Sequence, residues 1–152
     1  MEMNEFKAKL LQSTRKLNEA MDGCLDRMGS LEDLTPNQAR IIMIMNIEGS
    51  ASMGKISDSA SIAGGNLTNI CKVLEKRGLV ERGRDPSDDR KVLMQLTLKG
   101  QEIASKLDDW LTGRMEKGMP LNREDLMLMV EGLEKLSVMI IEMTKEKIDE
   151  RD

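Results

Sequence analysis

Three short helical patterns followed by a charged hairpin, all between Thr35 and Gly100, limit this chain to few folds. The first pattern opens with Thr35, Pro36 and Gln38, which supply an N-cap hydroxyl, a first-turn proline and a capping-box partner. A helix is therefore expected to begin here, and Gly49 is expected to end it. Apolar residues cover most of its circumference, as in a helix buried at the centre of a small domain; they are Ala39, Ile41, Ile42, Met43, Ile44 and Met45.

A second short helix is expected at about 54–61 and, after a turn at 62–65, a third. The third has an apolar face formed by Leu67, Ile70, Cys71 and Leu74, at i, i+3, i+4 and i+7. Its other faces carry amides, hydroxyls and cations, the groups that bind base edges and phosphates in a major groove. Most surface helices have a polar face without this role, so the helix alone is a weak signal. The residues that we expect at DNA here are Gly64, Gly65, Asn66, Thr68, Asn69 and Lys72.

The hairpin strengthens the nucleic-acid interpretation. Gly78 suits a left-handed helix cap, and residues 79–82 and 92–96 have the composition of two short strands. Residues 83–91 form a charged tip between them, from which Arg84, Asp88, Arg90 and Lys91 are expected to serve DNA binding. A projecting basic tip beside a polar helix suits a protein that straddles a groove. The predicted fold is therefore mainly α with a small β-hairpin wing, a winged helix-turn-helix flanked by N- and C-terminal dimerisation helices.

The stretches LVER, DPSDDR and LTLKG, ending at Gly100, resemble the wing signature of MarR-type transcription regulators. The similarity extends over nearly the whole chain in length and helix order. It implies a homodimer whose outer helices interlock, and which represses promoters and releases DNA when a small ligand or an oxidant arrives. By position, it implies that Arg90 enters the minor groove and that Asp88 orients it. It also implies an inverted repeat of double-stranded DNA as the binding site, with half-sites about one helical turn apart.

The start of the third helix departs from the family pattern. Gly64, Gly65 and Asn66 stand where Ser, Lys or Thr is common, and Asn69 stands where Arg is frequent. The glycines allow the backbone to approach phosphate closely, or they only relax the turn. Two alternatives therefore remain open: a dimeric ligand-binding or protein-interaction module that keeps the winged fold without binding DNA, and a regulator that activates rather than represses.

The distribution of charge along the chain supports DNA binding, whereas the net charge alone does not. The net charge is −4, but residues 50–99 hold nine Lys and Arg against six Asp and Glu, a net +3, which leaves −7 for the remainder. The positive charge thus coincides with the third helix and the wing. No segment approaches the roughly 20 apolar residues of a membrane span, and no signal-peptide core precedes the first helix, so a cytoplasmic protein without a membrane partner is expected.

The outer segments predict a homodimer. We expect three regions in one interlocked unit: an N-terminal dimerisation helix at 1–33, the winged domain at 34–99, and linker and dimerisation helices at 100–152. Thr97 and Asn122 are expected to cap the two C-terminal helices. Apolar stripes, one of which runs from Phe6 to Met28, are expected at opposite ends of the chain, outside the compact middle. One chain would have difficulty covering both, although a monomeric helical bundle is the alternative. The expected dimerisation residues are Phe6, Leu10, Leu17, Leu133, Leu136, Ile140 and Met143.

Composition gives little support to catalysis. The chain has no His, no nucleophile elbow and no phosphate-binding loop, so we expect neither an enzyme nor a metal site or cofactor. Cys24 and Cys71 are interpreted as core residues rather than redox sensors, since the chain lacks the tyrosines that support peroxide-sensing cysteines in related proteins. The fourteen methionines are core filler or an adaptable lining for a small apolar or aromatic effector, which the resemblance places between the dimer helices and the winged domain.

Overall fold

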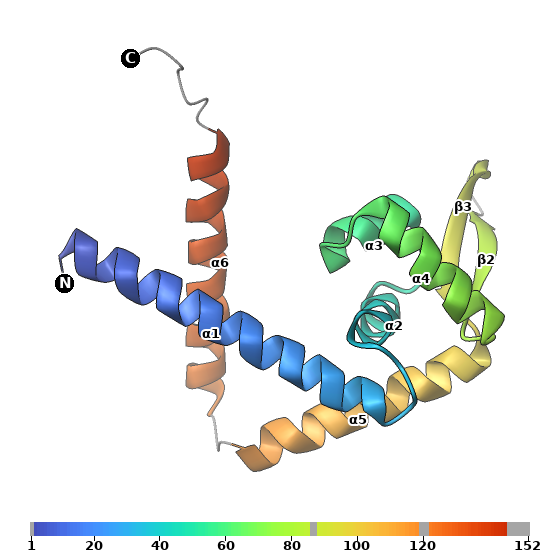
Figure 1. Cartoon of the computed structure of the whole chain (residues 1–152), viewed down its shortest axis with the longest axis horizontal. Coiled ribbons are helices and arrows are strands. Elements are labelled where there is room, and N and C mark those ends of the chain that lie inside the picture. The colour runs from blue at the N-terminus through green and yellow to red at the C-terminus, as the bar shows by residue number, and fades with distance from the viewer. Residues whose placement is uncertain (1, 86–87, 119–121, 146–152) are drawn as a thin grey trace. The chain divides into compact units, whose positions relative to one another are not determined.

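The computed structural model describes residues 2–85, 88–118 and 122–145. The described part is mostly helical and contains one three-stranded sheet (Figure 1). The predicted fold class, helices with a small β-hairpin, is therefore confirmed. The chain divides into two compact units, Met1–Thr112 and Gly113–Asp152.

A tight turn joins the first two helices, α1 (Met3–Ser30) and α2 (Pro36–Glu48). The Thr35 hydroxyl accepts a hydrogen bond from the Gln38 backbone N–H at 3.3 Å, and the Thr35 N–H donates to Gln38 Oε1 at 3.0 Å. The predicted capping box is thus confirmed. Gly49 ends α2 at a φ of 72°, a conformation that glycine adopts without strain.

Two short helices follow. Helix α3 (Met53–Ala60) begins one residue before its expected start, because the Ser52 hydroxyl caps it by accepting from the Lys55 N–H at 3.3 Å. Helix α4 (Gly64–Lys76) begins one residue before the predicted end of the turn. The expectation that both Gly64 and Gly65 belong to the turn is therefore wrong, and the two glycines form the first turn of α4.

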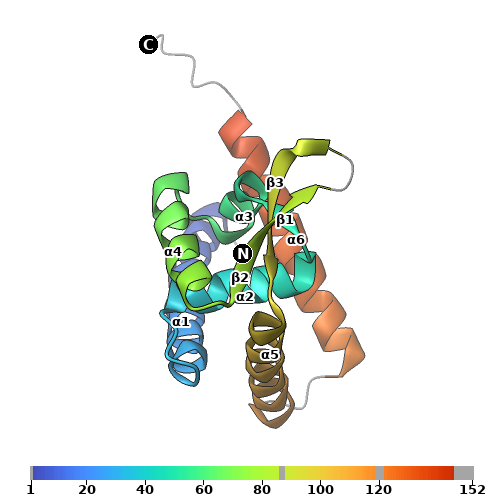
Figure 2. The same ribbon diagram turned by 90° about the vertical axis from the view of Figure 1, so that its right-hand side faces the viewer.

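The sheet has the order β1-β3-β2 and is antiparallel throughout, with β1 at Ala51–Ser52, β2 at Val80–Asp85 and β3 at Asp88–Leu96. The expected nine-residue tip at 83–91 is wrong, because its described residues lie in β2 and β3: Gly83, for example, lies opposite Leu93 in the ladder. The hairpin of β2 and β3 extends away from the helices as a two-stranded ribbon (Figure 2). Strand β1 was not predicted.

The core of the first unit lies around α2, against α3, α4 and the sheet. Ile41 and Ile42 are fully buried there, as the apolar circumference of this helix predicted. Leu25 and Met28, at the end of the N-terminal apolar stripe, also belong to this core. The expectation that the whole stripe lies outside the compact middle is therefore wrong for its last turns, which pack on α2.

Both predicted caps of the C-terminal helices are present. The Thr97 hydroxyl accepts from the Gly100 N–H at 3.1 Å at the start of α5 (Leu98–Gly118). Asn122 Oδ1 accepts from the Asp125 N–H at 2.9 Å at the start of α6 (Arg123–Lys145). None of the described helices has both the length and the hydropathy to cross a bilayer.

Candidate nucleic-acid interface

Helix α4 has one buried and one exposed face. Leu67, Cys71 and Leu74 are fully buried against the core, which fixes the rotation of the helix about its axis. Asn66, Asn69 and Lys72 are consequently exposed, on the face that the sequence assigned to DNA. A spacing of three residues on either side places Asn69 beside both of the others. The face thus offers two amides and one ammonium group within about two helical turns.

The N-terminal turn of α4 is open to solvent. Gly64 and Gly65 are exposed, and a Cβ added at either would meet nothing within 4 Å. No side chain caps this end of the helix. The backbone N–H groups of the first turn are therefore accessible to an anion such as a phosphate.

Thr68 is less available than the sequence suggested. Its side chain is half-buried, and its hydroxyl donates to the Gly64 carbonyl oxygen at 2.9 Å. The hydroxyl proton is thus used within the helix, and only the acceptor lone pairs face outward. Of the six positions expected at DNA on α4, Thr68 is the one that the structure engages internally.

The hairpin carries the other expected residues. Arg84 lies on β2 opposite Val92 and is exposed. On β3, the Lys91 ammonium lies 3.9 Å from the Asp88 carboxylate. The side chain of Arg90 falls outside the described residues, so its expected pairing with Asp88 stays a prediction.

An ion pair that the sequence did not reveal connects the hairpin to α4. Arg82 on β2 donates from Nε to Glu75 Oε1 at 2.7 Å and from a terminal nitrogen to Oε2 at 3.4 Å. The two-point contact raises the pKa of Arg82 above its ordinary value. We call this pair the wing latch. It holds β2 against the helix that presents the exposed amides.

Thr97 is the centre of a second junction. Its hydroxyl donates to the Gly78 carbonyl oxygen at 2.6 Å, and its N–H donates to the Leu79 carbonyl oxygen at 3.1 Å. Lys99 adds a hydrogen bond to the Arg77 carbonyl oxygen at 3.1 Å. The end of α4, the base of the hairpin and the start of α5 are therefore joined through one short segment.

Three cations at this surface are not neutralised. Lys72 and Lys76 on α4 and Arg84 on β2 make no ion pair within the described part of the chain. The other described cations of residues 50–99 are engaged: Lys55 with Glu48, Arg82 with Glu75, Lys91 with Asp88, and Arg77 and Lys99 with backbone carbonyls. The unpaired positive charge therefore lies on α4 and the hairpin.

The cysteines differ in their surroundings. Cys71 is fully buried, and the pKa of its thiol is raised, first by burial and then by the Glu75 carboxylate, while Arg82 opposes the shift. A buried thiol with a raised pKa is unreactive, so the interpretation of Cys71 as a core residue is confirmed. Cys24 is only half-buried. Among the described residues, no three His, Cys, Asp or Glu side chains are grouped so as to hold a metal.

The residues expected at a dimer interface are only partly covered. On α1, Phe6 and Leu10 are half-buried and Leu17 is exposed. On α6, Leu136 is half-buried, while three of the expected residues are largely exposed: Leu133 at 52%, Ile140 at 44% and Met143 at 68%. Large apolar side chains on this scale are unusual on the surface of a monomer.

Comparison with known proteins gives consistent matches. A model described as MarR family matches residues 32–91. The HTH-type transcriptional regulator FarR of Neisseria gonorrhoeae is 29% identical over 106 residues, which are 69% of this chain and 73% of FarR. A mutant MarR from E. coli, solved in complex with operator DNA, is similar with a TM-score of 0.69 at 21% identity, over 90% of this chain and 99% of that one. Bordetella bronchiseptica BpsR, in a study of how 6-hydroxynicotinic acid regulates its DNA binding, has a TM-score of 0.68 at 20% identity, over 85% and 98%.

Proposed function

Because the chain belongs to the MarR family of winged helix-turn-helix transcription regulators, we propose that it is a homodimeric, sequence-specific DNA-binding repressor that a small effector releases from DNA. The relatives are transcription regulators, in agreement with the expectation that the chain is not an enzyme. The operator complex of MarR supports the DNA part of the proposal, and the ligand dependence of BpsR supports the effector part.

One observation carries the proposal. The exposed face of α4 and the adjacent hairpin hold Lys72, Lys76 and Arg84, which make no ion pair with the residues that the structure describes, in a chain whose net charge is −4. Asn66 and Asn69 lie on the same exposed face of α4. Amides can read base edges in the major groove, and cations contact phosphates. We assign the amides to base contacts and the three cations to phosphates.

The proposed dimer rests on the apolar residues of α1 and α6 that are exposed or only half-buried in the single chain. Phe6, Leu10 and Leu17 of α1 and the apolar residues of α6 would be covered by the same segments of a second copy. A two-fold dimer would present two α4 helices, so we expect the binding site to be an inverted repeat with half-sites about one helical turn apart.

The test is fluorescence anisotropy of the full chain on DNA from upstream of its own gene, with scrambled DNA as reference, at several salt concentrations. Tighter binding to the upstream DNA, with a steep negative salt slope, is expected. Lys72→Ala should reduce that slope by about 1, since one phosphate contact is removed. Lys16→Ala is the matched control, because Lys16 is an exposed lysine of α1 outside the proposed surface, and its slope should stay unchanged.

The outcomes separate the alternatives. Equal and weak binding to both DNAs would contradict an operator upstream of the gene and direct the search to the rest of the genome. If neither DNA binds even at low salt, the DNA-binding proposal is wrong, and the winged fold serves as a ligand-binding or protein-interaction module. Transcript profiling of a deletion strain distinguishes repression, in which target transcripts rise, from activation.

A further inference from the structure

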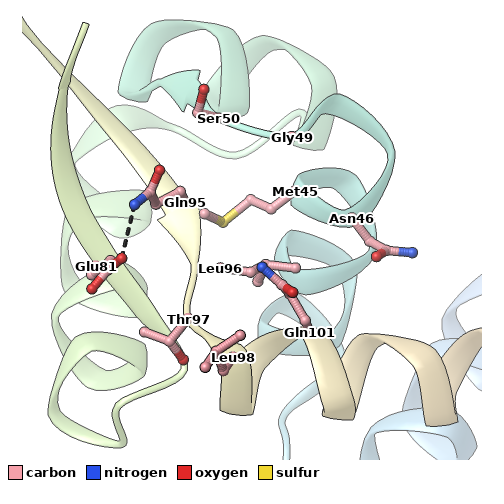
Figure 3. A pocket seen from close by; sticks show the side chains of 10 residues that line it. All are labelled: Met45, Asn46, Gly49, Ser50, Glu81, Gln95, Leu96, Thr97, Leu98 and Gln101. Carbon is pink, nitrogen blue, oxygen red and sulfur yellow. Dashed lines mark hydrogen bonds between the residues drawn. The ribbon is translucent and has the colours of Figure 1, made fainter. Parts of the chain in front are cut away.

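A pocket of about 560 Å³ lies at the base of the hairpin, within the first unit (Figure 3). It is bounded by the end of α2, the turn after it, both long strands and the start of α5. Its volume falls in the usual range for small-molecule sites, about 300–1,000 Å³. The lining residues are Met45, Asn46, Gly49, Ser50, Glu81, Gln95, Leu96, Thr97, Leu98 and Gln101.

The lining combines an apolar floor with polar residues. Met45 and Leu96 form the floor, at 1% and 8% exposure, and Figure 3 shows the Met45 side chain directed toward β3. Asn46 and Gln101 are among the polar residues that line the pocket. Glu81 is the one charged residue among the described residues that line the pocket. A carboxylate ligand would therefore find no counter-charge, whereas an organic cation would.

Glu81 is already in a hydrogen bond that a cation could replace. Gln95 Nε2 donates to Glu81 Oε1 at 2.8 Å, across the hairpin, and the two residues are register partners in the β2–β3 ladder. An ammonium group is a stronger partner for a carboxylate than a neutral amide is. Binding would thus exchange the cross-strand bond for a contact with the ligand.

The pocket is coupled to the DNA surface through one strand. Adjacent residues of a strand point to opposite faces, so Glu81 lines the pocket while Arg82, the next residue, makes the wing latch to Glu75 on α4. A ligand held by Glu81 therefore acts on the same strand that positions the hairpin against α4. From this geometry we infer that the pocket is an effector site for a small amphipathic organic amine, and that occupation lowers the affinity for DNA. The regulatory part of this inference rests on the proposed function.

The binding part is tested without DNA. The full chain is labelled with [methyl-¹³C]methionine, the Met45 signal is identified by its loss in Met45→Leu, and 2-phenylethylamine is titrated against phenylacetate at equal ionic strength. The amine should shift the Met45 signal, with an affinity at least about fivefold above that of the anion, as expected for one partly screened charge contact. Glu81→Gln should lower the affinity for the amine by a similar factor. Glu102→Gln is the matched control, because Glu102 is an exposed carboxylate on α5 outside the pocket, and this change should leave the affinity for the amine unaltered.

The inference is overturned if the Met45 signal does not move, if phenylacetate moves it equally, or if Glu81→Gln binds the amine unchanged. The regulatory part is tested by anisotropy on the operator, where the amine should release DNA from the native chain and from Glu102→Gln but not from Glu81→Gln. A Met45 shift that leaves DNA affinity unchanged overturns the regulation. A chain that binds no DNA overturns the proposed function, while the methionine titration still decides the site.

Discussion

Gly100 has the least room for a side chain of the glycines in the chain. A Cβ at this position would lie 2.0 Å from the carbonyl oxygen of Leu79, a backbone atom that cannot move aside cheaply. The close approach lets the first turn of α5 sit directly on the base of the hairpin, where Thr97 makes its hydrogen bonds. The threonine and the glycine of the LTLKG stretch thus have separate physical roles, a cap and a close contact.

Gly100→Ala should destabilise the chain by about 1–3 kcal/mol, because the added methyl group forces α5 away from the Leu79 backbone at the base of the hairpin. Gly113→Ala on the same helix is the control: its Cβ would meet nothing within 4 Å. That change should be neutral or stabilising by up to about 1 kcal/mol, as alanine favours helix. Urea unfolding followed by circular dichroism measures both, and equal stabilities of the two variants would contradict the contact.

Cys71 should react with a thiol reagent only when the chain unfolds. In a Cys24→Ser background, the rate of modification by 5,5′-dithiobis(2-nitrobenzoate) should rise with urea in parallel with the loss of helix. The pKa of the Cys71 thiol is higher in the folded chain than in the unfolded chain, so the thiol of the unfolded chain ionises first as pH rises. Above the pKa of the unfolded thiol, Cys71 therefore lowers the free energy of unfolding as pH rises. Cys71→Ala should remove this contribution to the loss of stability at alkaline pH. Rapid modification without urea would refute the buried position.

Helix α4 and the hairpin depend on each other through the wing latch. The Arg82 side chain is 49% exposed and that of Glu75 is 26% exposed, so solvent screens the ion pair and it should add little to stability. Its effect is expected instead on the orientation of the hairpin relative to the exposed face of α4.

Arg82→Glu should therefore weaken DNA binding several-fold while the unfolding midpoint changes little. The double variant Arg82→Glu with Glu75→Arg restores an ion pair of reversed direction and should recover part of the affinity in the anisotropy assay. A direct phosphate contact by Arg82 predicts no recovery, because the cation would then be absent from its place on β2. The double variant thus distinguishes positioning from contact.

Local signals predicted most of these elements correctly. The capping box at Thr35 and Gln38, the left-handed Gly78 and the caps at Thr97 and Asn122 each act within a few residues, so the sequence contains the whole interaction. The two strands of the wing were predicted too short, because the charged residues between them have the composition of a loop. Pairing of β2 with β3 overrides this tendency to form a loop. The strand conformation therefore cannot be predicted from either segment alone, because it depends on the partner strand.

The contacts that shape the candidate site could not be found in the same way. Strand β1 has two residues and forms because it meets β3. The wing latch joins residues seven positions apart on different elements, and the clash at Gly100 involves Leu79, 21 positions earlier in the bend before β2. Each depends on how elements pack, which no local pattern specifies.

The exposed apolar residues of α6 bear on the proposed assembly of two copies. Within the described part of α6, Leu126, Val130 and Leu133 are each at least 42% exposed, as are several methionines and isoleucines around them. Leu133→Asp should convert the proposed dimer into a monomer or an unstable chain, because a charge would be buried against the second copy. Sedimentation equilibrium measures the mass. Lys135→Asp, on the opposite face of α6, should leave a dimer, and a native chain that sediments as a monomer would refute the arrangement.

The exposed apolar side chains of α6 have a consequence for how much of the protein a cell must make. If a second copy covers them, the DNA-binding form appears with the square of the amount of free chain, so halving a scarce chain lowers the dimer about fourfold. The promoter would then respond to copy number more steeply than in proportion. Gene dosage and dilution at cell division would then change the activity of the promoter in addition to any effector.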